Sequence, residues 1–168
     1  EKLIEEIIET ERLSSRHGAL NKESKDLVAV IQELIDDFYA DAGLDINLPE
    51  QPVILELDVA RLKLLLKNLI DNSLRHTPVK ADPPAVTLTQ SRVKVEIEVE
   101  DRGVGVDAEH LPHLTEPFYR VDPARQRSTG GYGLGLYLCQ MIVDAHQGSL
   151  LIESKMGKGT KIVVALPR

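Results

Sequence analysis

The polar residues between positions 68 and 76 have the types and the spacing to hold a charged ligand. At ~100° per residue of a helix, Asn68, Asn72, Arg75 and His76 fall in one polar sector. The amide oxygen of Asn72 can serve Mg²⁺, which prefers oxygen ligands and commonly reaches proteins through substrate phosphates, and Arg75 can meet phosphate charge. Taken alone, this sector is better explained by a surface helix with a solvent-exposed polar face. It indicates a binding site only in combination with the other motifs.

A carboxylate followed by two spaced glycines stands at the end of a predicted strand. Asp101, Gly103 and Gly105 are typical of a simple turn. They also suit an adenine site, because a carboxylate accepts a hydrogen bond from the exocyclic amine while glycines let the backbone approach the ring. Guanine presents a carbonyl oxygen at that position, so two acceptors would face one another and the site would prefer ATP to GTP.

A glycine-rich run leads directly into the apolar pattern of the last helix. The run contains Gly131, Gly133 and Gly135, together with Leu134 and Leu136. The glycines reduce the stability of a helix at these positions. The first turn of a helix offers N–H groups and the positive dipole end to anions, which indicates a phosphate cradle. The run matches neither GxxxxGK followed by Ser or Thr nor a dinucleotide fingerprint. Upstream, residues 115–131 are either an ordinary solvated loop or a lid in which Arg120 meets phosphate.

Hydrophobic periodicity predicts the elements that must position these residues. Apolar residues at helical spacing predict helices over residues 3–13, 27–39, 59–75 and 134–146, and a helical turn over 107–114. Extended runs predict strands at 44–48, 53–57, 86–89, 93–99, 149–153 and 161–166. Helices between antiparallel-looking strand pairs favour an α+β fold, a two-layer sandwich in which a mixed, mostly antiparallel sheet packs on helices.

Composition limits the classes of function. The chain has 168 residues, 42% of them hydrophobic, which is enough for one buried core and a small appendage. Its net charge of -7 opposes phosphate attraction, so nucleic acid is not an expected partner. One cysteine, Cys139, excludes an internal disulfide and fits a reducing compartment, and no run approaches the ~20 apolar residues that cross a bilayer.

Five motifs in order resemble the catalytic ATP-binding domain of bacterial two-component sensor histidine kinases. The stretch from Asn68 to Pro78 resembles the N box and Asp101–Gly105 the G1 box. The remaining matches are Phe118, Tyr119 and Arg120 in an F-box-like stretch, Gly131 to Leu136 in a G2-like stretch, and Thr160 after the last glycine turn. Each motif is weak alone, but the order and spacing of the five are specific.

This resemblance implies the Bergerat ATP-binding fold, with ATP and Mg²⁺ bound between the N-box helix and the lid. By similarity Asp101 reads the adenine amine, Asn72 binds Mg²⁺ and Asn68 supports the N-box contacts. Arg75 and Arg120 would face the phosphates as charge-stabilising residues, and His76 stands where many relatives have tyrosine. The other expected nucleotide contacts are Gly103, Gly105, Phe118, Tyr119, Gly131, Gly133, Leu134, Gly135, Leu136 and Thr160.

The same resemblance implies a domain order and partners. Residues 1–20 would end a helix of a dimerisation and phosphotransfer hairpin, 21–25 would be a linker, and 26–168 the catalytic domain. The γ-phosphoryl of ATP would pass to a histidine on that hairpin and then to an aspartate of a response regulator. The parent would be a homodimer anchored in the bacterial inner membrane, with this domain in the cytoplasm. A nucleotide-gated ATPase clamp of the same superfamily is the alternative.

Overall fold

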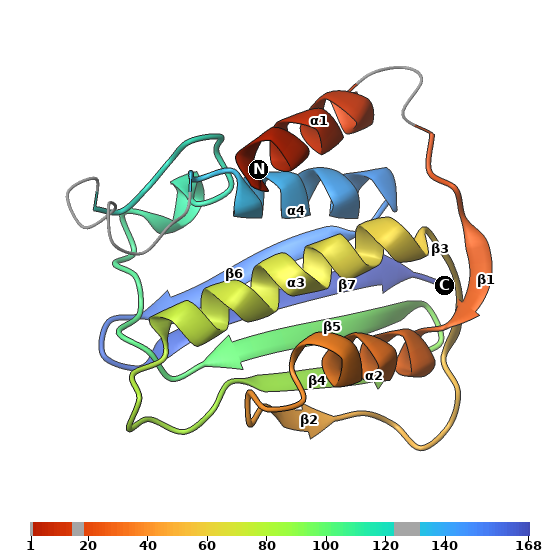
Figure 1. Ribbon diagram of the computed structural model, residues 1–168, viewed down its shortest axis with the longest axis horizontal. Helices are drawn as coiled ribbons and strands as arrows, with labels where there is room; N and C mark the ends of the chain where they lie inside the picture. Colours follow the sequence, from red (N-terminus) through yellow and green to blue (C-terminus); the bar gives the residue numbers. More distant parts are fainter. Residues whose placement is uncertain (1, 15–18, 123–131) are drawn as a thin grey trace.

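The computed structural model describes residues 2–14, 19–122 and 132–168 (Figure 1). A five-stranded sheet forms one layer, in the order β2-β4-β5-β7-β6. Its strands are β2 (Asp45–Asn47), β4 (Ala85–Gln90), β5 (Lys94–Asp101), β6 (Ser149–Lys155) and β7 (Gly159–Pro167). Only the β2–β4 pair of this sheet is parallel, and its other three pairs are antiparallel. The expected α+β sandwich with a mixed sheet is confirmed.

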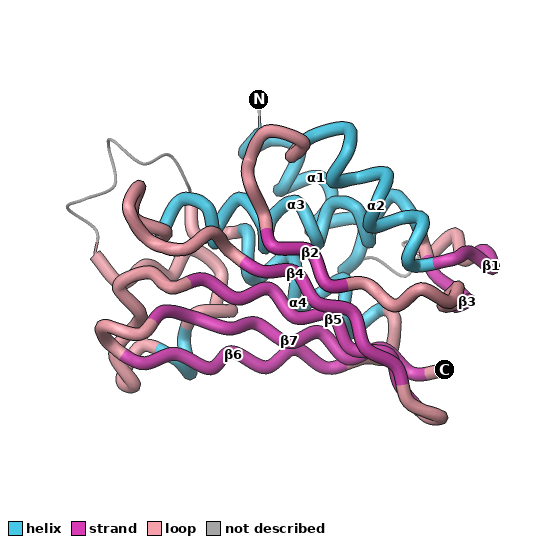
Figure 2. Tube along the Cα trace, turned by 90° about the horizontal axis from the view of Figure 1, so that it is seen from below, coloured by secondary structure: helices cyan, strands magenta, loops and turns pink. Residues whose placement is uncertain are grey.

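Three helices cover one face of the sheet, as the edge-on view in Figure 2 shows. They are α2 (Leu27–Phe38), α3 (Val59–His76) and α4 (Gly135–Ala145). The side chain of Asp26 accepts a hydrogen bond from the N–H of Val28 and caps α2, and Asp58 caps α3 in the same way through the N–H of Arg61. Helices α2 and α3 therefore each start at a short acidic side chain, close to the predicted position.

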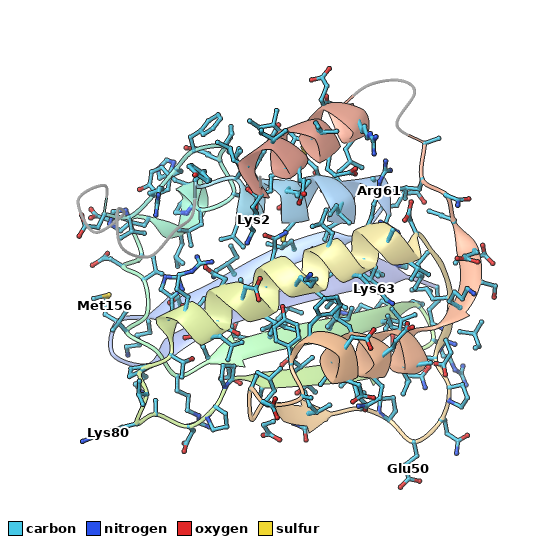
Figure 3. The ribbon with its side chains drawn as sticks, in the orientation of Figure 1. Lys2, Glu50, Arg61, Lys63, Lys80 and Met156 are labelled. Carbon is cyan, nitrogen blue, oxygen red and sulfur yellow. The ribbon has the colours of Figure 1, made fainter. Side chains whose placement is uncertain are left out.

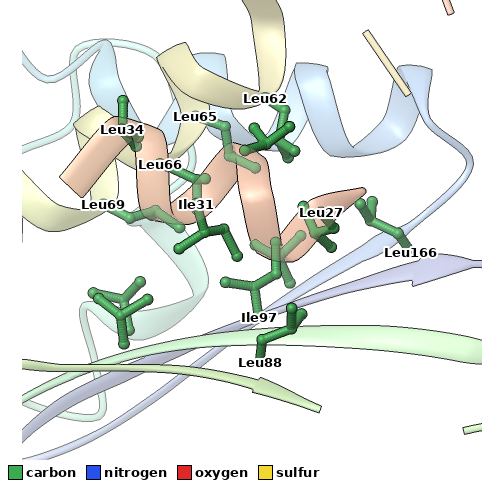
Figure 4. Packing of buried hydrophobic residues seen from close by; sticks show 14 of the residues in the cluster. Leu27, Ile31, Leu34, Leu62, Leu65, Leu66, Leu69, Leu88, Ile97 and Leu166 are labelled. Atoms are coloured by element: carbon green, nitrogen blue, oxygen red, sulfur yellow. The ribbon is translucent and has the colours of Figure 1, made fainter. Parts of the chain in front are cut away.

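The core lies between these helices and the sheet (Figure 4). In β5 the residues Val95, Ile97 and Val99 alternate with half-exposed glutamates, so one face of the strand is buried and the other faces water. Leu62, Leu66 and other leucines of α3 pack on that face. The strand predicted over 93–99 starts one residue too early, because β5 begins at Lys94 and Val93 is 72% exposed in the preceding turn.

A second, two-stranded sheet joins the start of the domain to the segment before α3. Strand β1 (Glu23–Asp26) pairs antiparallel with β3 (Ile54–Leu57). Most of β1 falls within residues 21–25, for which the sequence predicted a linker. The alternation in β3 buries Leu55 and Leu57, and the N–H of Leu27 bonds to the carbonyl of Val53. This pairing ties the end of the predicted linker to the globular domain.

Helix α1 (Lys2–Ser14) lies along α4 (Figure 1). Its predicted amphipathic character is present, but its orientation is unusual because the side chain that it buries is Glu6. Ile4, Ile7 and Ile8 are 62%, 47% and 45% exposed. Within the described part of the chain, this apolar stripe therefore remains about half exposed. A search of the described helices finds none with the length and hydropathy of a membrane span.

Candidate functional site

Helix α3 presents the polar residues singled out in the sequence beside its leucine face. Asn68 donates its amide N–H to the carbonyl of Leu64 at 3.0 Å, which fixes the side chain with Oδ1 near Gly135. The Nδ1 of His76 lies 2.8 Å from the carbonyl oxygen of Asn72. No hydrogen bond of the half-exposed Asn72 side chain is found among the described residues, so its amide oxygen is available to a hard cation.

Asp101 is the last residue of β5 and is 4% exposed. Its Oδ1 accepts two backbone hydrogen bonds, from the N–H of Gly103 at 2.9 Å and of Thr160 at 3.3 Å. Burial raises the pKa of this carboxyl above its ordinary value, and the two N–H donors oppose that shift. The structure gives Oδ2 no hydrogen bond within the described residues. One carboxylate oxygen is thus fixed, and the other can accept a bond from a ligand.

Gly103 brings the end of β5 against the end of α3. A Cβ at this position would overlap the carbonyl oxygen of His76 and come within 2.8 Å of Oδ1 of Asp101. The backbone contact between the two motifs therefore requires glycine. It places the Asp101 carboxylate beside the C-terminal turn of α3, which carries the expected phosphate-facing residues.

Thr160 is held by a second set of bonds at the start of β7. The hydroxyl of Ser154 lies 2.8 Å from the Thr160 hydroxyl, and it donates to the carbonyl of Gly159. The same Ser154 oxygen accepts from the N–H of Val106 at 2.8 Å. These contacts fix the N–H of Thr160 where it meets Asp101.

The glycine-rich run closes the site from the other side. Gly133 has φ of 74° and its carbonyl accepts a hydrogen bond from the N–H of Phe118 at 2.9 Å. At Gly135, the first residue of α4, a Cβ would lie 3.1 Å from Oδ1 of Asn68. The loop thus meets the polar sector of α3 directly. The first N–H groups of α4 have no partner within the helix and are suited to anions.

Some of the residues predicted to contact the nucleotide have side chains that are buried or directed to other protein groups. Leu134 is 3% exposed and Leu136 packs on the core, so only their backbones can meet a ligand. The ring centroid of Tyr119 lies 6.1 Å from that of His110 and 5.3 Å from that of His113. Phe118 is 65% exposed. Of the loop predicted over 115–131, residues 123–131, with Gly131, lie outside the described residues.

The sequence pattern did not indicate that Glu6 is buried. Glu6 of α1 is 6% exposed, and burial raises the pKa of its carboxyl above the ordinary value, against the lowering effect of Lys2 and Arg75. Arg75 itself is exposed at the last turn of α3. The acidic run around Glu6 gave no sign of burial, because its neighbours in sequence are equally acidic. Helix α1 therefore contributes a buried carboxylate on whose pKa the charge of Arg75, one of the residues predicted to face the phosphates, has a lowering effect.

A groove of about 690 Å³ runs between α1 and α3 and reaches Asn68 and Asp71. Lys2 and Arg61, both labelled in Figure 3, belong to its lining, which is rich in charges of both signs. Asp101 and the glycines are not part of it. The base site argued from Asp101 is therefore distinct from this groove, which reaches the polar sector of α3 at Asn68.

Comparison with known proteins gives consistent matches. The sequence model of the family described as "Histidine kinase-, DNA gyrase B-, and HSP90-like ATPase" matches residues 57–168. The sensor protein SrrB of Staphylococcus aureus (strain NCTC 8325 / PS 47) is 32% identical over 171 residues, which cover 99% of this chain and 29% of SrrB. The chain thus spans less than a third of the length of this curated relative.

Solved structures share the fold. The full-length structure of ShkA in complex with AMPPNP superposes with a TM-score of 0.82 at 21% identity, over 99% of this chain and 35% of that one. The histidine kinase AdeS of Acinetobacter baumannii superposes with a TM-score of 0.75 at 22% identity, over 99% and 77% of the two chains. At these identities the likeness concerns the fold.

Proposed function

The chain belongs to the histidine kinase-, DNA gyrase B-, and HSP90-like ATPase family, as an ATP-binding catalytic domain of the sensor histidine kinase type, and from this premise we propose the reaction that it performs. It binds Mg-ATP and passes the γ-phosphoryl to a histidine on a dimerisation hairpin, for relay to an aspartate of a response regulator. In the first step the bond from the γ-phosphorus to its bridging oxygen breaks, a P–N bond forms with the imidazole, and ADP leaves with the electron pair.

The carboxylate of Asp101, of which only one oxygen is hydrogen-bonded, is the observation that supports this proposal most strongly. Two backbone N–H groups hold Oδ1, while Oδ2 has no hydrogen bond within the described residues. Because no buried side-chain oxygen of the described residues lacks a hydrogen bond, Oδ2 is accessible to a ligand although the residue as a whole is only 4% exposed, and the exocyclic amine of adenine is a donor that it can accept from. The contact at Gly103 sets this acceptor beside the last turn of α3, and the same helix meets Gly135 through Asn68.

Phosphoryl transfer requires positioning and charge neutralisation more than covalent help from the protein. When bound with ATP, Mg²⁺ supplies neutralisation of charge on the phosphates. The residues of this chain have separate tasks in the proposal: Asn72 offers its amide oxygen to the cation, Gly133 and Gly135 bring backbone N–H groups to the phosphates, and Arg75 and Arg120 add positive charge. The protein thus holds the triphosphate in one pose and leaves its γ end open to an incoming imidazole.

The partners follow from the same proposal. We assign residues 1–20 to the end of a hairpin helix and 26–168 to the catalytic domain. The exposed Ile4, Ile7 and Ile8 support this division, because a half-exposed apolar stripe suits a helix that packs against another helix of a hairpin. The parent protein would then be a homodimer anchored in the bacterial inner membrane, with this domain on its cytoplasmic side.

Phosphotransfer in trans tests the proposal. A hairpin polypeptide that carries the acceptor histidine is mixed with this chain and γ-labelled ATP, and we expect label on the hairpin that is labile in acid and stable in alkali. Asp101→Asn should reduce this label, whereas exposed Glu100→Gln should not. A folded pair that gives no label, or steady ATP hydrolysis without the hairpin, contradicts the kinase and favours the gated ATPase clamp.

A further inference from the structure

The residue before Tyr119 has a backbone conformation that must be held in place by its surroundings. Phe118 has φ of 64°, which is unfavourable for a bulky side chain. Its side chain is 65% exposed, so packing of the ring does not hold it. Its N–H donates to the carbonyl of Gly133, and the next N–H, that of Tyr119, donates to the carbonyl of Glu116 at 3.3 Å. The turn is thus bonded on one side to the described part of the glycine-rich run, Gly133 to Gly135, which we call the glycine loop.

On its other side the turn is held by the side chain of Tyr119. The phenol oxygen lies 2.6 Å from Nδ1 of His110. The ring centroid lies 5.3 Å from that of His113, at an interplanar angle of 32°. We name His110, His113 and Tyr119 the histidine–tyrosine clamp. The clamp occupies the tyrosine with protein groups, so this side chain is directed to the clamp and not to a ligand.

The clamp is anchored to the sheet. His113 ends the 3-10 helix η1 (Leu111–His113), which lies against β6, and its Nδ1 is 2.8 Å from Oε1 of Glu116. The chain that leads into η1 is bonded to β6 as well, through the N–H of Val106 and the hydroxyl of Ser154. Both imidazoles therefore rest on a segment that the five-stranded sheet positions.

Close backbone contacts connect the clamp to the glycine loop. A Cβ at Gly133 would lie 2.9 Å from the carbonyl oxygen of Tyr119 and 2.9 Å from the carbonyl carbon of Phe118, so the two backbones are packed without space for a methyl group. Two residues on, Gly135 reaches Asn68. A displacement of Tyr119 is therefore transmitted to Gly133, and from there to the first turn of α4.

We propose that Tyr119, fixed by His110 and His113, is a positioning residue that sets the glycine loop for the phosphates of the nucleotide. This inference rests on the proposed binding of Mg-ATP, and it replaces the direct nucleotide contact that the sequence predicts for Tyr119. Because Asp101 binds the base through a separate part of the fold, the clamp should act on phosphate affinity and leave affinity for the nucleoside unchanged.

A double-mutant cycle tests the proposal. Tyr119→Phe removes the hydroxyl and keeps the ring, and His110→Ala removes its partner. Each should weaken Mg-ATP binding about fivefold, the effect of one lost neutral hydrogen bond, with adenosine binding unchanged. The double variant should lose no more than either single one, because both break the same bond. His110→Asn, which keeps an amide near the position of Nδ1, should restore most of the affinity.

Tyr39→Phe is the matched control. It deletes a hydroxyl that bonds to Asp71 at 2.6 Å and to no residue of the clamp, and it should lower stability without changing either affinity. Additive losses in the cycle, or equal losses for adenosine and ATP, would overturn the proposal. NMR spectra of the backbone amides, recorded without nucleotide, test the clamp independently of the proposed ATP binding. Shifts of Gly133 and Gly135 in Tyr119→Phe, absent in Tyr39→Phe, support the clamp even if the wild type binds no ATP, and their absence refutes it.

Discussion

Replacement of Asp101 by asparagine changes one atom at the point where the base is read. The amide oxygen of asparagine can keep the bonds from the N–H groups of Gly103 and Thr160, because these go to a single oxygen, Oδ1. The NH2 group then takes the place of Oδ2 and faces the adenine amine, donor against donor. A hydrogen bond to a charged group is worth about 1.5–3 kcal/mol, so ATP binding should weaken about 10- to 150-fold.

The variant should also change the preference between bases. The wild-type carboxylate faces the guanine carbonyl oxygen as one acceptor against another, whereas the NH2 group of Asp101→Asn can donate to that oxygen. GTP binding should therefore improve while ATP binding falls. Titration of both nucleotides with Mg²⁺, by displacement of a fluorescent ATP analogue, measures the two changes together.

Two controls separate recognition from folding. Because both backbone bonds to Oδ1 are kept, the free energy of unfolding of Asp101→Asn in urea should stay within about 1 kcal/mol of the wild type. Glu100→Gln changes the neighbouring, exposed carboxylate in the same way and should leave both affinities unchanged. If folded Asp101→Asn binds ATP as tightly as the wild type does, with the same preference over GTP, the assignment of the base site is refuted.

Three further variants test other parts of the account. Gly103→Ala should destabilise the fold by about 1–3 kcal/mol and abolish tight nucleotide binding, because the methyl group would displace the His76 carbonyl, as urea unfolding and titration will measure. Asn72→Ala should lose about tenfold in Mg²⁺-dependent ATP affinity and keep the affinity measured in EDTA. The third concerns His146, whose Nε2 accepts from the N–H of Asp58 at 3.1 Å and whose pKa is lowered by burial. Since the unfolded chain takes up this proton near pH 6.5, the stabilising effect of the neutral ring is present above about that pH and is lost as the pH falls below it. His146→Gln should flatten that part of the pH dependence of thermal unfolding between pH 7.5 and about 5.5.

Local patterns were sufficient to predict most of the fold. The leucine spacing of α3, the alternation from Val95 to Val99 and the capping carboxylate at Asp58 each specify an element without reference to the rest of the chain. Their combination was enough for the two-layer α+β sandwich. The start of β5 was predicted one residue too early, because Val93 continues the alternation into the turn that precedes the strand, where the N–H groups of Val93 and Lys94 bond to the Ser91 hydroxyl.

The missed features depend on contacts between segments far apart in sequence. The pairing of β1 with β3 gives Glu23 to Asp26 an extended conformation, although these residues are polar and resemble a linker when taken alone. Burial of Glu6 depends on how α1 lies along α4. The contact of Gly103 with His76 likewise appears only when α3 and β5 are assembled. Residue types therefore predict which groups can bind a nucleotide, and the packing determines which of them meet.

A crystal structure of this chain with Mg²⁺ and a non-hydrolysable ATP analogue is the most direct test of the central claim. The account predicts the adenine amine within hydrogen-bonding distance of Oδ2 of Asp101, the cation on the amide oxygen of Asn72, and the phosphates against Gly133 and Gly135. Nucleotide bound instead in the charged groove between α1 and α3, with Asp101 untouched, would contradict it.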